Sequence, residues 1–197
     1  MTAIYPILPG RLLWSGEHWI CFLRAPGTGK DTARVSLYRS HYSPAGEGHA
    51  AFVAVPGRFQ AVLTDNRAFL AFIRETMFRG KAPPFDPGLP VVDAVFRRGG
   101  ELSESPSWTL ETRDHHLDVT WTRLEPPDVA YRGDPELQSR RPVFTVLFFC
   151  QGARVLLDGR RIGGAPYPRS IWRDALGGGD RSSCVFAIAE TMIRPPG

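Results

Sequence analysis

Two carboxylates lie on strand-like segments among apolar side chains, where a carboxylate can take part in proton transfer. Alternation along segment 182–193 puts Glu190 on one face with Cys184, Phe186, Ile188 and Met192. The same alternation puts Asp93 on one face with Val91 and Val95. Burial among apolar groups disfavours the charged form and raises the pKa of a carboxyl group, which suits it to general acid–base catalysis. The alternative for each residue is a place near a strand end or an ion pair with one of the many arginines.

Several aromatic residues lie on predicted strands or on a short predicted helix, where they could shape an apolar binding site. Tyrosine and tryptophan add a hydrogen-bond donor to a large apolar surface. The candidates for ligand binding are Trp121, Tyr38, Tyr167, Trp172 and Phe186. Core packing is the alternative role for each of them.

The sequence has no motif for a metal, a nucleotide or an activated nucleophile. The five histidines are His18, His41, His49, His115 and His116. No two of them show helical i, i+4 spacing, and no Cys-x-x-Cys group is present, so we expect no metal site. The APGTGKDT segment, 25–32, departs from a phosphate-binding loop, because Arg24 and Asp31 replace the required glycine and hydroxyl residue. A Gly-x-Ser-x-Gly elbow and a dinucleotide fingerprint are also missing. We therefore expect no cofactor.

Composition indicates one globular domain spanning 1–197. The chain has 197 residues, of which 43% are hydrophobic and 22% are charged. Cys21, Cys150 and Cys184 are odd in number and lie in apolar segments, which predicts buried free thiols. The N-terminus lacks the features of a secretion signal, and no apolar run could span a bilayer, so we expect a cytoplasmic protein without a membrane partner. The sequence is compatible with a homodimer.

The net charge of +4 raises the question of a nucleic-acid partner. The basic residues are scattered, with pairs only at 97–98, 140–141 and 160–161, and no basic face repeats along a helix. We therefore expect no nucleic-acid binding.

Short strand-like segments separated by turn residues account for most of the chain. Segment 142–164 combines apolar runs with breaks at Gln151-Gly152 and Asp158-Gly159, which predicts successive antiparallel strands. About ten strands, without βαβ alternation or an internal repeat, predict an antiparallel β-barrel or a closed sandwich. We favour the barrel, because many strands are apolar on both faces. Segment 116–124 has one dry and one polar face, and the pattern does not say which one faces the lumen.

Two helices are expected beside the strands. An amphipathic helix is predicted near 66–79, after the capping signal Thr64-Asp65, from an apolar stripe spaced at three and four residues: Phe69, Phe72, Ile73, Thr76 and Met77. A short helix is predicted near 168–176, between a proline and a run of glycines. We expect the longer helix to pack on the sheet.

The order of strands, the VLLDGR turn at 155–160, the WRDALGG segment at 172–178 and the final SSCVFAIAE strand resemble the calycin or lipocalin-like barrels of bacterial secondary metabolism. Carotenoid hydratase-like proteins and small barrel polyketide cyclases belong to this group. The resemblance covers about the last third of the chain. The lipocalin Gly-x-Trp signature is one residue too long here, at Gly16 to Trp19. No catalytic residue is transferred from these families.

The function that remains after these exclusions is a cofactor-independent cyclase or isomerase. It would hold an apolar, polyketide-like or terpenoid-like molecule in a barrel cavity, with Glu190 and Asp93 as the catalytic residues. The alternative is a binding or carrier protein that uses the same cavity without chemistry. A third possibility is a structural or interaction protein whose barrel is filled by its own side chains, and such a filled barrel would count against the first two.

Overall fold

The computed structural model describes residues 11–78, 82–132 and 143–194. No helix in these ranges is long and apolar enough to cross a membrane. Their elements follow in chain order: β1 (Arg11–Arg24), β2 (Asp31–Tyr42), β3 (Gly48–Val55), β4 (Phe59–Thr64), α1 (Arg67–Thr76), β5 (Val91–Asp93), β6 (Val95–Gly99), β7 (Ser107–Glu111), β8 (His116–Leu124), β9 (Asp128–Arg132), β10 (Val143–Leu157), β11 (Arg160–Ile162), β12 (Pro168–Arg169), α2 (Ile171–Leu176), β13 (Arg181–Ser182) and β14 (Cys184–Arg194).

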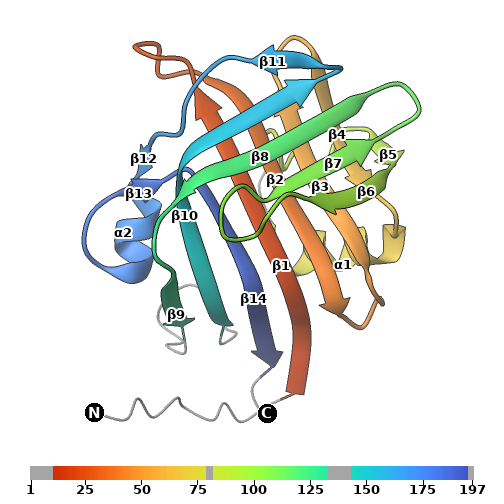
Figure 1. The fold of residues 1–197 in the computed structure, drawn as a ribbon. Helices are drawn as coiled ribbons and strands as arrows, with labels where there is room; N and C mark the ends of the chain where they lie inside the picture. The colour runs from red at the N-terminus through yellow and green to blue at the C-terminus, as the bar shows by residue number, and fades with distance from the viewer. Residues whose placement is uncertain (1–10, 79–81, 133–142, 195–197) are drawn as a thin grey trace.

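Ten of these strands form one curled sheet in the order β5-β4-β3-β2-β1-β14-β10-β8-β7-β6 (Figure 1). Neighbouring strands are antiparallel, apart from the parallel pair β4–β5. The sheet is nearly closed, because β5 and β6 at its two ends follow each other in the chain across Ala94. Strands β9 and β11 pair with β10, and β12 and β13 form a separate small sheet. The predicted β-barrel is confirmed.

The barrel interior is filled by aromatic side chains. Trp19 is fully buried, and its ring centroid lies 4.2 Å from that of Phe186 and 5.1 Å from that of Trp121. Trp108 packs edge-on against Trp19 at 6.0 Å. Leu117 and Val119 belong to the same cluster, so the dry face of β8 points inward. At this level side chains of the described residues occupy the interior, where a ligand cavity was expected.

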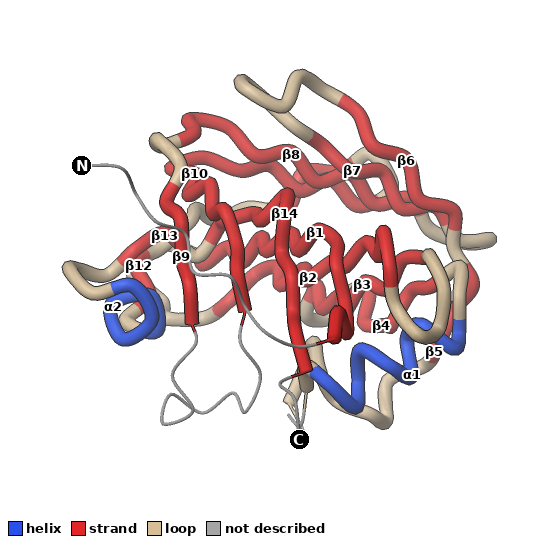
Figure 2. Tube along the Cα trace, turned by 90° about the horizontal axis from the view of Figure 1, so that it is seen from below, coloured by secondary structure: helices blue, strands red, loops and turns tan. Residues whose placement is uncertain are grey.

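Both helices lie on the outer face of the wall made by β1 to β4 and β14, on the side away from β6 to β8 (Figure 2). Helix α1 packs Phe69, Leu70 and Ile73 against the outward side chains of β2, β3 and β4. The side chain of Asn66 caps this helix by accepting the Phe69 N–H at 3.0 Å. Helix α2 packs Trp172 against the same wall nearer to β10. The two helices thereby cover part of the apolar outer surface of the barrel.

The two predicted helices are both present, with shorter bounds than expected. Helix α1 begins after Asn66 rather than at the Thr64-Asp65 signal, because the Asp65 carboxylate accepts the backbone N–H of His49 at 2.6 Å instead. Residues 79–81, at the predicted end of that helix, lie outside the described ranges. Residues 168–169, at the predicted start of α2, form a strand.

Candidate functional site

A bulge in β14 decides which way Glu190 points. Ala187 pairs with His18 of β1, whereas Glu190 pairs with Gly16, so three steps along β14 oppose two along β1. An extra residue of this kind moves every later side chain to the other face of the strand. Phe186 therefore points into the barrel, and Glu190 points outward with His18. The predicted shared face of Glu190 and Phe186 is wrong.

Glu190 and His18 form a partly buried pair on the outer face. Glu190 Oε2 lies 3.9 Å from His18 Nδ1, and the side chains of Glu190 and His18 are 13% and 17% exposed. Burial raises the pKa of Glu190 to about 7 and lowers that of His18 to about 3. Both groups are therefore uncharged in weakly acidic solution, because loss of hydration disfavours each charged form.

Two residues of β2 hold the His18 ring in place. His18 Nε2 lies 3.0 Å from the hydroxyl oxygen of Ser36, and the ring stacks on Tyr38 with centroids 3.9 Å apart. The pKa of Tyr38 is raised well above its usual value by burial and by the nearby charge of Glu190. Phe78 packs edge-on against Tyr38 at 5.5 Å and covers it from the loop after α1. The structure thus brings together two predicted site residues, Glu190 and Tyr38.

Near neutral pH this cluster can give or accept a proton. Glu190 exists there in both protonation states, since its pKa is about 7. A general acid or base works best when its pKa lies close to the working pH. His18 stays neutral and can orient the carboxyl group without competing for the proton. Among the described residues, His18 is the only basic side chain within 4.0 Å of the Glu190 carboxyl group, at 3.9 Å.

Glu17, the residue before His18, lies on the inner face of β1 and has the opposite character. Its side chain is 3% exposed, and its carboxylate accepts hydrogen bonds from Trp19 Nε1 at 2.9 Å, Arg98 at 3.0 Å and Arg39 at 3.1 Å. His41 Nε2 lies 3.3 Å away. Both oxygens of this carboxylate accept hydrogen bonds, so it serves to join β1, β2 and β6 rather than to move a proton. The alternation of residues in the sequence did not predict this network.

Asp93, the second predicted catalytic residue, lies far from the expected setting. Its side chain is 79% exposed and pairs with Arg67 Nη2 at 2.8 Å. β5 is an end strand of the sheet and only three residues long, so nothing covers this side chain. The prediction of an apolar environment for Asp93 is wrong, and the structure does not bring it near Glu190.

The other predicted ligand-binding residues are divided between two places. Trp121 and Phe186 lie in the filled barrel interior, and Trp121 Nε1 donates to the carbonyl oxygen of Ile20 at 2.8 Å. Tyr167 and Trp172 lie on the outer face, in the cluster that includes α2. These four residues therefore do not surround one site with Glu190.

The three cysteines are free and buried, as the sequence predicts. Cys21 and Cys184 face each other across β1 and β14, with their sulfur atoms 3.8 Å apart. Contact with the Cys184 thiol and burial raise the pKa of Cys21, and burial raises that of Cys150. Thiols in this state are poor nucleophiles. Within the described ranges, no three histidine, cysteine or acidic side chains come together in a group that could hold a metal ion.

Comparison with known proteins assigns no family to the chain. No protein-family model matches the sequence, and a search of curated proteins finds no match.

Proposed function

We propose that this protein is a cofactor-independent cyclase or isomerase that moves a proton on an apolar small molecule, with Glu190 as the proton-transfer group. The observation that supports this is the partly buried Glu190, whose pKa is raised to about 7 beside a neutral His18. A structural carboxylate in this fold looks different. Glu17 is held by two arginines and an indole N–H, whereas Glu190 faces one weak base.

The surroundings of Glu190 favour an apolar substrate. Trp14 and Met192 belong to the apolar cluster on one side of it, and Ile20 and Ala187 belong to the cluster on the other. A molecule bound among such groups would lose its water shell, which strengthens hydrogen bonds and proton transfer within the site. We assign the site to the outer face of β1 and β14 because aromatic side chains fill the interior. The resemblance to calycin-like barrels supports a polyketide-like or terpenoid-like substrate.

The alternative is a binding or carrier protein for an apolar small molecule. The separation of Asp93 from Glu190 favours it, because an enzyme of the predicted kind would have used both carboxylates. Binding without proton transfer needs the apolar surroundings but not the raised pKa of Glu190. The two functions therefore differ in what replacing that single carboxyl group does.

Hydrogen–deuterium exchange on test substrates distinguishes the two functions. The purified protein is incubated in D2O with a panel of apolar 1,3-diketones and terpenoid ketones, and deuterium at the carbon next to the carbonyl is followed by mass spectrometry. Glu190 as general base takes the proton from that carbon, and the exchanged acid returns a deuteron. We expect the wild type to accelerate exchange, and Glu190→Gln to slow it by about 100-fold or more.

Asp93→Asn is the matched control, because it also replaces a carboxylate with an amide but on an exposed residue. It should exchange at the wild-type rate. Binding of each ketone is measured separately through the change in tryptophan fluorescence. Exchange that is equally fast in Glu190→Gln and the wild type would refute the enzyme. Ketone binding without any accelerated exchange would favour the carrier.

A further inference from the structure

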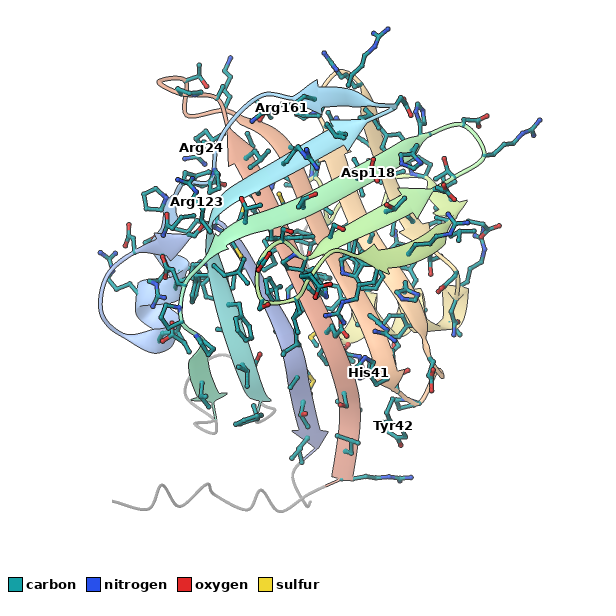
Figure 3. The ribbon with its side chains drawn as sticks, viewed as in Figure 1. Arg24, His41, Tyr42, Asp118, Arg123 and Arg161 are labelled. Carbon is teal, nitrogen blue, oxygen red and sulfur yellow. The ribbon has the colours of Figure 1, made fainter. Side chains whose placement is uncertain are left out.

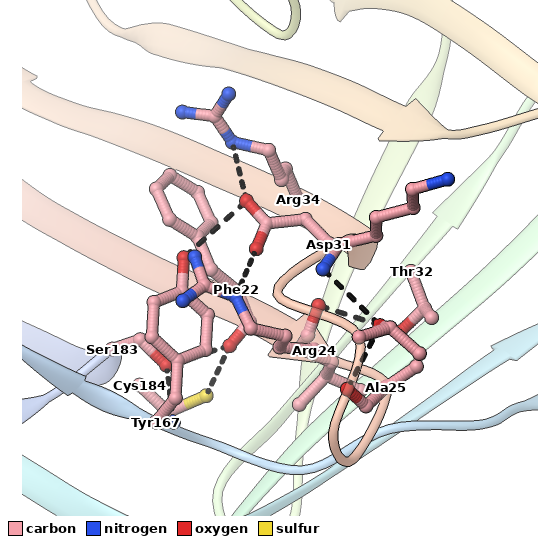
Figure 4. Close-up of polar contacts among 12 residues, drawn as sticks. Phe22, Arg24, Ala25, Asp31, Thr32, Arg34, Tyr167, Ser183 and Cys184 are labelled. Atoms are coloured by element: carbon pink, nitrogen blue, oxygen red, sulfur yellow. Dashed lines mark hydrogen bonds and ion pairs between the residues drawn. The ribbon is translucent and has the colours of Figure 1, made fainter.

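A second polar cluster lies on the same outer face, at the other end of β1 and β2. Arg24 lies at the upper end of the barrel and His41 at the lower end in the view of Figure 3. Arg24 ends β1, Asp31 begins β2, and Arg34 follows on β2. Figure 4 shows these three side chains meeting beside Tyr167 and Phe22. Arg169, on β12, completes the set.

One carboxylate serves as the common partner of this cluster. Asp31 Oδ1 accepts a hydrogen bond from Arg24 Nε at 3.0 Å, and Asp31 Oδ2 accepts one from the Tyr167 hydroxyl at 3.3 Å (Figure 4). Arg34 Nε lies 3.6 Å from Asp31 Oδ2, too far for a hydrogen bond, and it is buried without another acceptor among the described residues. A second nitrogen of Arg34 donates to the carbonyl oxygen of Pro83. Asp31 is thus shared among several donors.

Arg169 has an aromatic partner but no ion pair within the described part of the chain. Its guanidinium carbon lies 5.1 Å from the ring centroid of Phe22, and that of Arg34 lies 4.7 Å from the same ring. No described residue gives Arg169 a hydrogen bond or an ion pair. Burial lowers the pKa of Arg169, and the positive charges of Arg34 and Arg24 lower it further.

The charges in this cluster do not balance. Arg24 and Arg34 pair with Asp31, and Arg169 lies over the Phe22 ring that Arg34 also contacts, so among the described side chains of this cluster three positive charges stand against one carboxylate. All three guanidinium groups lie over aromatic rings, Arg24 over Tyr167 at 3.6 Å and both Arg34 and Arg169 over Phe22. Holding like charges together in a half-buried place costs free energy unless an anion offsets it.

We infer that Arg24, Arg34 and Arg169 form a binding site for a dianionic oxyanion of the phosphoryl type. The planar fork of arginine donates two parallel hydrogen bonds to phosphate oxygens, and two negative charges match the local excess. The Tyr167 hydroxyl lies at the edge of the site and could donate to the anion in place of Asp31. Nothing in the local sequence suggested this site, because its three arginines come from separate strands.

The site is separate from the proposed proton-transfer group. His18 and Phe22 are four residues apart on β1, which corresponds to about 13 Å along a strand. Phosphate binding therefore does not depend on whether Glu190 has a catalytic role. Glu190→Gln should leave the affinity for phosphate unchanged, so the two proposals can fail independently.

Calorimetric titration with sodium phosphate and, in parallel, with phenyl phosphate tests the site, with sodium chloride at matched ionic strength as the blank. We expect saturable binding of at least one phosphate compound and a loss of at least tenfold in affinity in Arg169→Gln. The variant should fold, because Arg169 makes no ion pair to a described residue. Tighter binding of phenyl phosphate would identify a phosphate ester as the ligand, and equal binding would identify the free ion.

Arg113→Gln is the matched control, since Arg113 is an exposed arginine in the turn between β7 and β8. It should bind phosphate as the wild type does. Phosphate should also raise the midpoint of thermal unfolding of the wild type and of Arg113→Gln, but not that of Arg169→Gln. Should Arg169→Gln fail to fold, Arg24→Gln takes its place. No saturable binding of either phosphate compound, or equal loss in Arg113→Gln, would overturn the inference.

Discussion

His18 Nδ1 lies 3.9 Å from Glu190 Oε2, across β1 and β14, and the two groups favour their uncharged forms. In water such a pair would be an imidazolium and a carboxylate near pH 6. Here burial moves the pKa of His18 down to about 3 and that of Glu190 up to about 7. Between about pH 3 and pH 7 both members are therefore mainly uncharged, and the pair gains no stability from an ion pair. As pH rises, Glu190 lowers the free energy of unfolding, whereas His18 raises it.

Replacing Glu190 with glutamine should make the protein more stable at alkaline pH. The folded pKa of about 7 lies above the ordinary value of 4.5, so the stability that the neutral acid provides is present below pH 4.5 and is lost as pH rises through 7. The interval corresponds to about 3 kcal/mol, at 1.36 kcal/mol for each pKa unit. The free energy of unfolding of Glu190→Gln, minus that of the wild type, should rise by this amount between pH 4.5 and 8 in urea titrations.

His18→Gln provides a control of opposite sign. The folded pKa of His18, about 3, lies below its ordinary 6.5, so the wild type loses stability as pH falls below 6.5. The free energy of unfolding of His18→Gln, minus that of the wild type, should therefore rise toward acid. A difference that stays flat with pH in both variants would contradict the burial of this pair.

Removing the Glu17 carboxylate should destabilise the fold through the barrel interior. Glu17→Ala leaves the guanidinium groups of Arg39 and Arg98 without their acceptor beside a buried indole N–H. Breaking a buried pair costs 3–5 kcal/mol, and partial exposure of the two arginines reduces this to about 2–3 kcal/mol in the free energy of unfolding. Arg97→Gln, which breaks an exposed pair with Glu111, should change it by less than about 0.5 kcal/mol. Equal effects in urea unfolding would show that the Glu17 network is not structural.

Periodicity predicted the elements of this fold well, because it reports burial directly. The stripe of Phe69 and Ile73 predicted α1, and the alternation of Leu117 with Trp121 predicted a strand with one dry face. Both patterns are local, with the spacing that a helix or a strand imposes. Local pattern was sufficient for the barrel.

The same alternation failed for the site because β14 contains a bulge. One extra residue between Ala187 and Glu190 turned the candidate acid from the barrel interior to the outer wall, and no turn residue marks that position. The predicted apolar environment of Asp93 was wrong for another reason. A strand at the end of a sheet is not covered, and alternation does not reveal the order of strands in the sheet. Glu17 and Arg98 are 81 positions apart and meet only because the barrel closes.

Gly16 should not tolerate even one added methyl group. Its backbone pairs with Glu190 on one side and with Ser40 on the other, and a Cβ there would lie 2.1 Å from the carbonyl oxygen of Arg39 and 2.8 Å from the Trp14 ring. The carbonyl belongs to a paired strand and cannot move aside without breaking the ladder. Gly16→Ala should therefore lower the free energy of unfolding by about 2 kcal/mol or more. Gly179→Ala, where a Cβ meets no atom within 4 Å, should change it by less than about 0.5 kcal/mol. Similar urea midpoints for the two variants would mean that β1 and β2 do not approach each other as closely at Gly16 as described.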